Sequence, residues 1–244
     1  MVLFEDQVGY EIFLRSLIHA HGRVPIELFS YCLMPNHFHL VVRPDSDVQL
    51  SQFMRRLTST HGKRWHTLRG SVGGGAVYQG RFRAVPVQGD RHFLTVCRYV
   101  ERNALRAKLV TRAEAWPWSS AHQRCNLSHV IELSTWPILQ PGNWTDILNG
   151  SEPVAEAAAI RKALVQGLPL GDPAWRNATI QRLGLEGKER GRGRPAGKKT
   201  PGVFSGDIDP KNTRCFFNAR RSLPHPAVRL PAAAPPGADR PGQS

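Results

Sequence analysis

Cysteine is scarce in this 244-residue chain, and its copies stand far apart. The four cysteines, Cys32, Cys97, Cys125 and Cys215, never come within four residues of one another. This spacing excludes a local CxxC pair for zinc or redox chemistry, and it suits the reduced cytoplasm. Long apolar runs are also missing, since the run at 38–42 is far too short to span a bilayer. The N-terminus lacks the pattern of a secretory signal, so we expect an unexported, cytoplasmic protein without a membrane partner.

Acidic residues are few compared with basic ones. The chain has 19 Asp and Glu against 33 Lys and Arg, a formal charge of +14. A polyanion bound with release of counterions accounts for such an excess, so nucleic acid is the expected partner. A solvated basic protein with no such partner is the alternative, because net charge informs on association rather than on fold. The length suits one domain with appendages.

A β-hairpin is predicted before residue 43. Residues 26–33 are rich in β-forming types, Pro35-Asn36 marks a reversal, and residues 37–42 alternate with a period of two. Side chains on a strand alternate between the two faces of the sheet. The register therefore buries Phe38, Leu40 and Val42 on one face and places His37, His39 and Val41 on the other.

Three longer helices are predicted from apolar residues at helical spacing, over residues 6–20, 47–68 and 90–107. Residues 78–87 read as a strand. The glycine-rich stretch at 70–75 is interpreted as a loop, because it lacks the lysine and the strand-loop-helix setting of a phosphate-binding loop. Helices therefore flank each predicted strand region.

We predict three parts along the chain. Residues 1–125 form the catalytic domain, and residues 126–200 form a basic extension with short helices near 153–166 and 173–183. Residues 201–244 are dense in Pro, Ala and Arg with little periodicity, which predicts a disordered tail. The fold class is α+β, an antiparallel sheet with helices packed on it.

His37 and His39 are candidate metal ligands. Two residues apart on a strand, they project from the same face, close enough to hold one divalent cation between their imidazoles. Ordinary hydrogen-bonded histidines explain most such pairs, so this alternative stays open for the pair taken alone.

Tyr99 is a candidate nucleophile, and Asn103 stands one helical turn after it. A metal ion on the two imidazoles, with the Asn103 carbonyl oxygen as a third ligand, would polarise a scissile phosphate. Attack by the phenol would leave a tyrosyl phosphate and a free hydroxyl. The ester keeps the energy of the broken bond, so joining to another strand end needs no external energy. A half-buried helix tyrosine without a chemical role is the alternative.

Four motifs, in order, resemble one known family. Residues 31–42 (YCLMPNHFHLVV) resemble the HUH-motif hairpin of the REP-associated tyrosine transposases, relatives of the bacterial single-tyrosine insertion-sequence transposases. Residues 79–82 (QGRF) resemble the strand after the family's second helix, and 98–107 (RYVERNALRA) resemble its nucleophile helix, where a proline usually replaces Ala104. Residues 116–120 (WPWSS) match its closing motif.

This resemblance implies a ferredoxin-like domain that cleaves and rejoins single-stranded or hairpin DNA, such as a palindromic repeat, through a 5′-phosphotyrosine. It implies His37 and His39 as metal ligands, Tyr99 as the nucleophile, and Mg²⁺ or Mn²⁺ as the cofactor. Asn103 stands where the family places a further metal-binding side chain. A homodimer is compatible with this family.

The resemblance lacks the family's usual first strand. Family members usually open with a strand and a short basic loop before the segment that resembles residues 2–6. We therefore expect a sheet that is one strand short, with exposed backbone hydrogen-bonding groups. This motivates a second hypothesis, a catalytically inactive, truncated or domesticated DNA-binding protein of the same family. A replication initiator or relaxase, which uses the same chemistry but usually carries further domains, is a third.

Basic residues supply candidate DNA contacts. Phosphate contacts are expected from the second helix, the next strand and an AT-hook-like RGRP segment at 192–195, whose alternative is a solvated linker. Trp65 and Tyr78 are candidate stacking surfaces for unpaired bases, or else core residues. The expected DNA-binding residues are Arg55, Arg56, Lys63, Arg64, Arg81, Arg83, Arg192 and Arg194.

Overall fold

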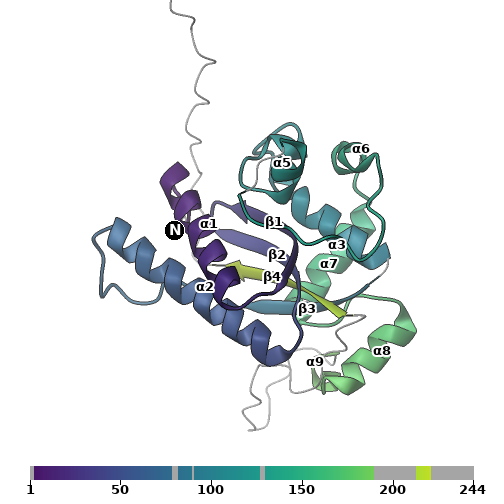
Figure 1. Ribbon diagram of the computed structural model, residues 1–244. Helices are drawn as coiled ribbons and strands as arrows, with labels where there is room; N and C mark the ends of the chain where they lie inside the picture. The colour runs from purple at the N-terminus through teal and green to yellow at the C-terminus, as the bar shows by residue number, and fades with distance from the viewer. Residues whose placement is uncertain (1–2, 79–81, 90, 127–129, 190–212, 221–244) are drawn as a thin grey trace, which may run out of the picture.

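The computed structural model describes residues 3–78, 82–89, 91–126, 130–189 and 213–220. Its centre is a four-stranded sheet whose neighbouring strands run antiparallel in the order β1-β2-β4-β3. Helices pack on both faces of this sheet (Figure 1). The predicted α+β class, with an antiparallel sheet flanked by helices, is therefore confirmed.

Strands β1 (Glu27–Met34) and β2 (His37–Arg43) form the predicted hairpin. Its register pairs Cys32 with His39. Both faces of the hairpin are covered, and His39 is only 1% exposed. The two faces are divided as predicted, because Phe38, Leu40 and Val42 join one core cluster and Val41 joins the other.

Helices α1 (Gln7–Arg23) and α2 (Asp47–Leu68) cover the face of the sheet opposite the histidines. They lie together on one side of the strands in Figure 1. Each begins at a side-chain cap, since Asp6 accepts a backbone N–H at 2.8 Å and Ser46 accepts one at 3.2 Å. The predicted helix at 47–68 has the bounds of α2, and the first predicted helix extends to Arg23.

The histidine face of the sheet is covered by α3 (Arg91–Glu101) and α4 (Asn103–Arg106). The sequence predicts one helix over 90–107, whereas the structure interrupts it at Arg102. Helix α3 packs on the sheet through Phe93, Val96 and Val100, all 0% exposed. This packing fixes the side from which Tyr99 approaches the histidines.

Short helices follow α4, and α7 and α8 are the two that the sequence predicts. Trp136, Trp144, Leu148 and Ile160 lie in the same core cluster as the α3 side chains, so the segment beyond residue 125 packs against the nucleophile helix. No described helix is long and apolar enough to cross a membrane. The elements are η1 (Ala113–Ala115), α5 (Ser120–Cys125), α6 (Trp144–Asn149), α7 (Val154–Gln166), α8 (Pro173–Arg182) and α9 (Glu186–Glu189).

Strand β4 (Thr213–Arg220) departs from the predicted disorder of residues 201–244. It lies between β2 and β3 (Arg83–Gln88), pairing with both (Figure 1). In a ferredoxin-like fold this position belongs to a strand that precedes the first helix. The expectation of a sheet short of one strand is thus corrected, since β4 satisfies the backbone groups of both neighbours. Its Thr, Cys and Phe residues favour a strand. The remainder of the predicted tail lies outside the described residues.

Candidate active site on the histidine strand

The two histidines converge through their Nε2 atoms. His37 Nε2 and His39 Nε2 are 3.0 Å apart, and the rings are nearly perpendicular at 88°. His37 is half-buried at the start of β2, and its Nδ1 lies 2.6 Å from the Asn36 Oδ1. Asn36 therefore orients the ring so that its other nitrogen faces His39. The period of two along β2 brings the pair together, as predicted.

This spacing fits two ligands of a single cation. Two nitrogens about 2.1 Å from an ion, at an octahedral angle of about 90°, are separated by about 3.0 Å. A direct hydrogen bond between the imidazoles gives a similar separation, so the geometry accommodates both arrangements. Among the described residues no cluster of three or more His, Cys, Asp or Glu side chains is suited to a metal ion. A third protein ligand would have to be of another type.

Tyr99 lies on the same face of the sheet as the histidines. Its ring centroid is 6.0 Å from that of His39, with an interplanar angle of 81°. Tyr99 is 5% exposed and belongs to the core cluster formed by α3 and the sheet. The structure therefore brings the predicted nucleophile and histidine pair together within one chain.

Asn103 stands one turn beyond Tyr99, at the start of α4. Its Nδ2 donates to the Tyr99 carbonyl oxygen at 3.1 Å, and the residue is 7% exposed. With the nitrogen engaged by the helix, the amide oxygen is the atom suited to a hard cation. Asn103 thus has the chemistry of a third ligand that is neither imidazole nor carboxylate.

Arg106 also contacts Tyr99, a contact that the sequence did not predict. The guanidinium carbon lies 3.9 Å from the centre of the Tyr99 ring, and Nη2 donates to the Tyr99 carbonyl oxygen at 3.1 Å. Nη1 donates to both carboxylate oxygens of Glu152, at 3.0 and 3.1 Å. The separation of seven residues between Arg106 and Tyr99, two helical turns, is the signal that could have indicated the first of these contacts.

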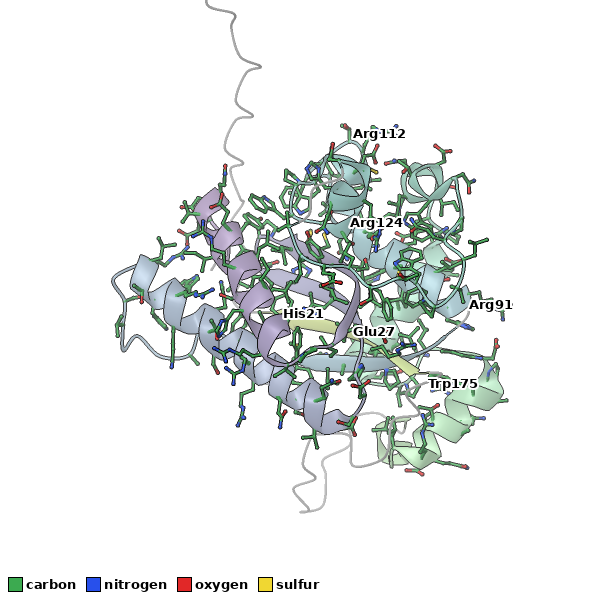
Figure 2. The ribbon with its side chains drawn as sticks, viewed as in Figure 1. His21, Glu27, Arg91, Arg112, Arg124 and Trp175 are labelled. Atoms are coloured by element: carbon green, nitrogen blue, oxygen red, sulfur yellow. The ribbon has the colours of Figure 1, made fainter. Side chains whose placement is uncertain are left out.

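A buried carboxylate holds α3 from behind. Glu101 is 0% exposed and accepts hydrogen bonds from Ser30 at 3.1 Å, Ser120 at 2.5 Å and Trp144 at 2.8 Å. Arg124 of α5, labelled in Figure 2, forms an ion pair with the same carboxylate. A buried charge needs such partners, so Glu101 ties the nucleophile helix to β1, α5 and α6.

The basic residues predicted to bind DNA fall in three places. Arg55, Arg56 and Lys63 are exposed on α2, where they line a polar pocket of about 500 Å³ together with Arg23. This pocket lies on the helix layer that covers the face opposite the histidines. Arg64 points elsewhere, donating to Ser16 at 3.2 Å.

The remaining predicted DNA contacts lie on other parts of the chain. Arg83 is exposed at the start of β3 and donates to the carbonyls of Leu164 and Val165, both at 3.4 Å. It therefore approaches α7 rather than α2. The predicted Arg81, Arg192 and Arg194 lie outside the described residues.

Trp65 and Tyr78 belong to the core, so the interpretation of them as base-stacking surfaces is corrected. Trp65 is 3% exposed and donates from Nε1 to the Leu3 carbonyl at 3.1 Å. Tyr78 packs against the same cluster, and its hydroxyl lies 2.6 Å from His61 Nδ1. The apolar pattern of α2 turns Trp65 inward.

Comparison with known proteins relates the first part of the chain to one family. The model of the family described as "Transposase IS200 like" matches residues 4–103. No curated protein and no solved structure matches the chain. The matched region runs from before α1 to Asn103 and includes His37, His39 and Tyr99. Over these residues the chain is similar to the IS200-like transposases.

Proposed function

We propose that this protein is a transposase-type DNA nuclease and strand transferase of the single-tyrosine kind, related to the REP-associated tyrosine transposases. The supporting observation is the packing of Tyr99 against His39, within the strand that also carries His37. The family match over residues 4–103 supports transposase chemistry in general. The 3.0 Å separation of the histidine Nε2 atoms supports the metal-dependent form of that chemistry.

The reaction is attack of the Tyr99 phenol oxygen on a DNA phosphorus. A bond forms between that oxygen and phosphorus, and the bond from phosphorus to the 3′ oxygen breaks. The phenol proton leaves to solvent, and the departing 3′ oxygen takes up a proton, so the products are a 5′-phosphotyrosine and a 3′ hydroxyl. The reverse reaction with another 3′ end rejoins DNA, because one phosphoester replaces another at each step.

His37, His39 and the Asn103 carbonyl oxygen would hold the cofactor, Mg²⁺ or Mn²⁺. When bound, the ion supplies Lewis-acid polarisation of the phosphate and neutralises the developing negative charge. The chain's own contribution is orientation. Asn36 fixes the ring of His37, and the hydrogen bond to the Tyr99 carbonyl fixes the amide of Asn103. Magnesium and manganese both accept nitrogen and amide oxygen ligands in octahedral geometry.

The substrate is single-stranded or hairpin DNA, such as a palindromic repeat. The pocket formed by Arg23, Arg55, Arg56 and Lys63 offers four cationic side chains to phosphates. This pocket and the histidine pair lie on opposite sides of the sheet. We therefore assign phosphate positioning to α1 and α2, and bond cleavage to β2 and α3.

Covalent adduct formation tests this function. Full-length protein is incubated with a labelled hairpin oligonucleotide that has a single-stranded flank, in Mg²⁺ or Mn²⁺, and resolved on a denaturing gel. We expect a protein–DNA band that Tyr99→Phe abolishes. Tyr10→Phe is the matched control, because Tyr10 lies in the other core cluster, stacked on Trp118 at 4.7 Å.

The second candidate, a catalytically inactive DNA-binding protein, is favoured by the basic pocket that stands apart from the histidines. It predicts that the hairpin binds but that no adduct forms in any metal. A Tyr99→Phe variant that keeps the full adduct yield would exclude Tyr99 as the nucleophile.

A further inference from the structure

Arg106 holds the ring of Tyr99 from one face. Its guanidinium lies 3.9 Å from the ring centre, within the distance at which a cation and an aromatic face attract each other. The same guanidinium donates to the Tyr99 carbonyl oxygen at 3.1 Å. One side chain therefore contacts both the ring and the backbone of the proposed nucleophile.

Glu152 holds Arg106 in turn. Both carboxylate oxygens of Glu152 accept from Nη1, and the two side chains are only 13% and 21% exposed. Glu152 lies between α6 and α7, in the part of the chain beyond the family match. Screening by water is weak at such an ion pair, so it fixes the guanidinium more firmly than a surface pair does.

The segment that carries Glu152 contacts the nucleophile helix at three more points. Trp144 donates to Glu101, Arg102 donates to the carbonyls of Leu148 and Gly150, and Arg98 pairs with Glu156 at 2.9 Å. Residues 144–156 thus brace α3 and α4 along two turns. Of these contacts, the pair of Arg106 and Glu152 includes the side chain that touches the Tyr99 ring.

We infer that Arg106, held by Glu152, is a positioning residue for Tyr99. This inference rests on the proposed function of Tyr99. The guanidinium restricts the ring to the orientation that faces His39, and its charge favours the negative charge that develops on the ring as the phenol proton leaves. The segment around Glu152 therefore serves cleavage by orienting the nucleophile.

Single-turnover adduct formation tests the inference, with DNA affinity measured on the same proteins. We expect Arg106→Gln to slow adduct formation by about 10-fold, from the size of a partly buried cation–aromatic contact, while the hairpin Kd changes by less than about twofold. Arg106→Lys should recover part of the rate, and Glu152→Gln should lose an intermediate amount. Arg98→Gln is the matched control, since it breaks a comparable ion pair on the same helix.

Fluorine NMR gives a second measurement that does not depend on DNA cleavage. The chain is labelled with 3-fluorotyrosine, and the resonance that disappears in Tyr99→Phe is assigned to Tyr99. We expect this resonance to shift and broaden in Arg106→Gln but to stay in place in Arg98→Gln.

The outcomes separate the two proposals. An Arg106→Gln protein with an unchanged resonance, or with the adduct rate of the parent, overturns the role of Arg106. Equal losses of rate and of melting temperature in the Arg106 and Arg98 variants overturn it as well. If the parent forms no adduct while the resonance responds as expected, the proposed function fails, and the orientation of Tyr99 by Arg106 stands.

Discussion

Lowering the pH from 7 to 5 should destabilise the folded protein through His61, a buried histidine of α2. The residue is 0% exposed, and its ring centroid lies 5.1 Å from that of Phe13. Its Nδ1 meets the Tyr78 hydroxyl at 2.6 Å, and its Nε2 has no hydrogen-bond partner among the described residues. Burial, and then the nearby charges of Arg69 and Arg64, lower the pKa of His61 to about 3.

The sign and size of the effect follow from the two pKa values of His61. In the unfolded chain the imidazole takes up a proton near its ordinary pKa of 6.5, whereas in the folded protein it stays neutral down to about 3. The stability contributed by His61 is therefore complete above pH 6.5 and is lost progressively between pH 6.5 and 3. At pH 5, about 1.5 pH units below the unfolded value, the loss is about 2 kcal/mol.

Urea denaturation at pH 7 and pH 5 measures this loss. The comparison protein is the double variant His61→Phe with Tyr78→Phe, which removes both hydrogen-bonding partners and keeps the aromatic packing. All other titrating groups are shared, so they cancel in the difference between the two proteins. We expect the parent to lose about 2 kcal/mol more than the variant over this pH range. Equal losses would show that His61 is not held neutral in the folded protein.

Three further predictions concern the nucleophile helix, strand β4 and the basic pocket. Glu101→Gln should lower the free energy of unfolding by about 3 kcal/mol, because it leaves the Arg124 guanidinium without its buried partner, whereas the exposed Glu11→Gln should change it by less than about 0.5 kcal/mol in the same urea titration. Phe216→Pro should cost about 3 kcal/mol or more, because proline removes a backbone donor from a strand that is paired on both sides; unchanged stability would contradict the placement of β4. Arg55→Gln with Arg56→Gln should weaken hairpin binding and reduce the slope of log K against log salt by about 2, and a slope equal to that of the exposed control Arg15→Gln would contradict phosphate binding in this pocket.

The hairpin and its two faces could be predicted because they depend on local periodicity. Alternation along residues 37–42 places Phe38 and His39 on opposite faces, whatever packs against them. The bounds of α2 follow from its apolar stripe and from the Ser46 cap. Tyr99 was placed beside the buried stripe of its helix, and the structure confirms that it meets the sheet there, 5% exposed.

Contacts between distant parts of the chain could not be predicted in this way. The Thr213–Arg220 strand is embedded in a segment rich in proline and alanine, and its partners in β2 and β3 lie more than 120 residues earlier. Glu152 meets Arg106 across 46 residues, and Glu101 meets Ser30 across 71. No local period encodes such pairs, so the positioning of Tyr99 emerges only from the folded structure.

Identification of the residue that carries DNA tests the central claim most directly. The protein is reacted with hairpin DNA in Mn²⁺, digested with nuclease and protease, and the modified peptide is sequenced by mass spectrometry. We expect a phosphonucleotide on Tyr99, formed by the parent protein and lost in His39→Ala and on chelation with EDTA. Modification of any other residue, or the same yield on Tyr99 after the metal and His39 are removed, would contradict a site built from His37, His39 and Tyr99.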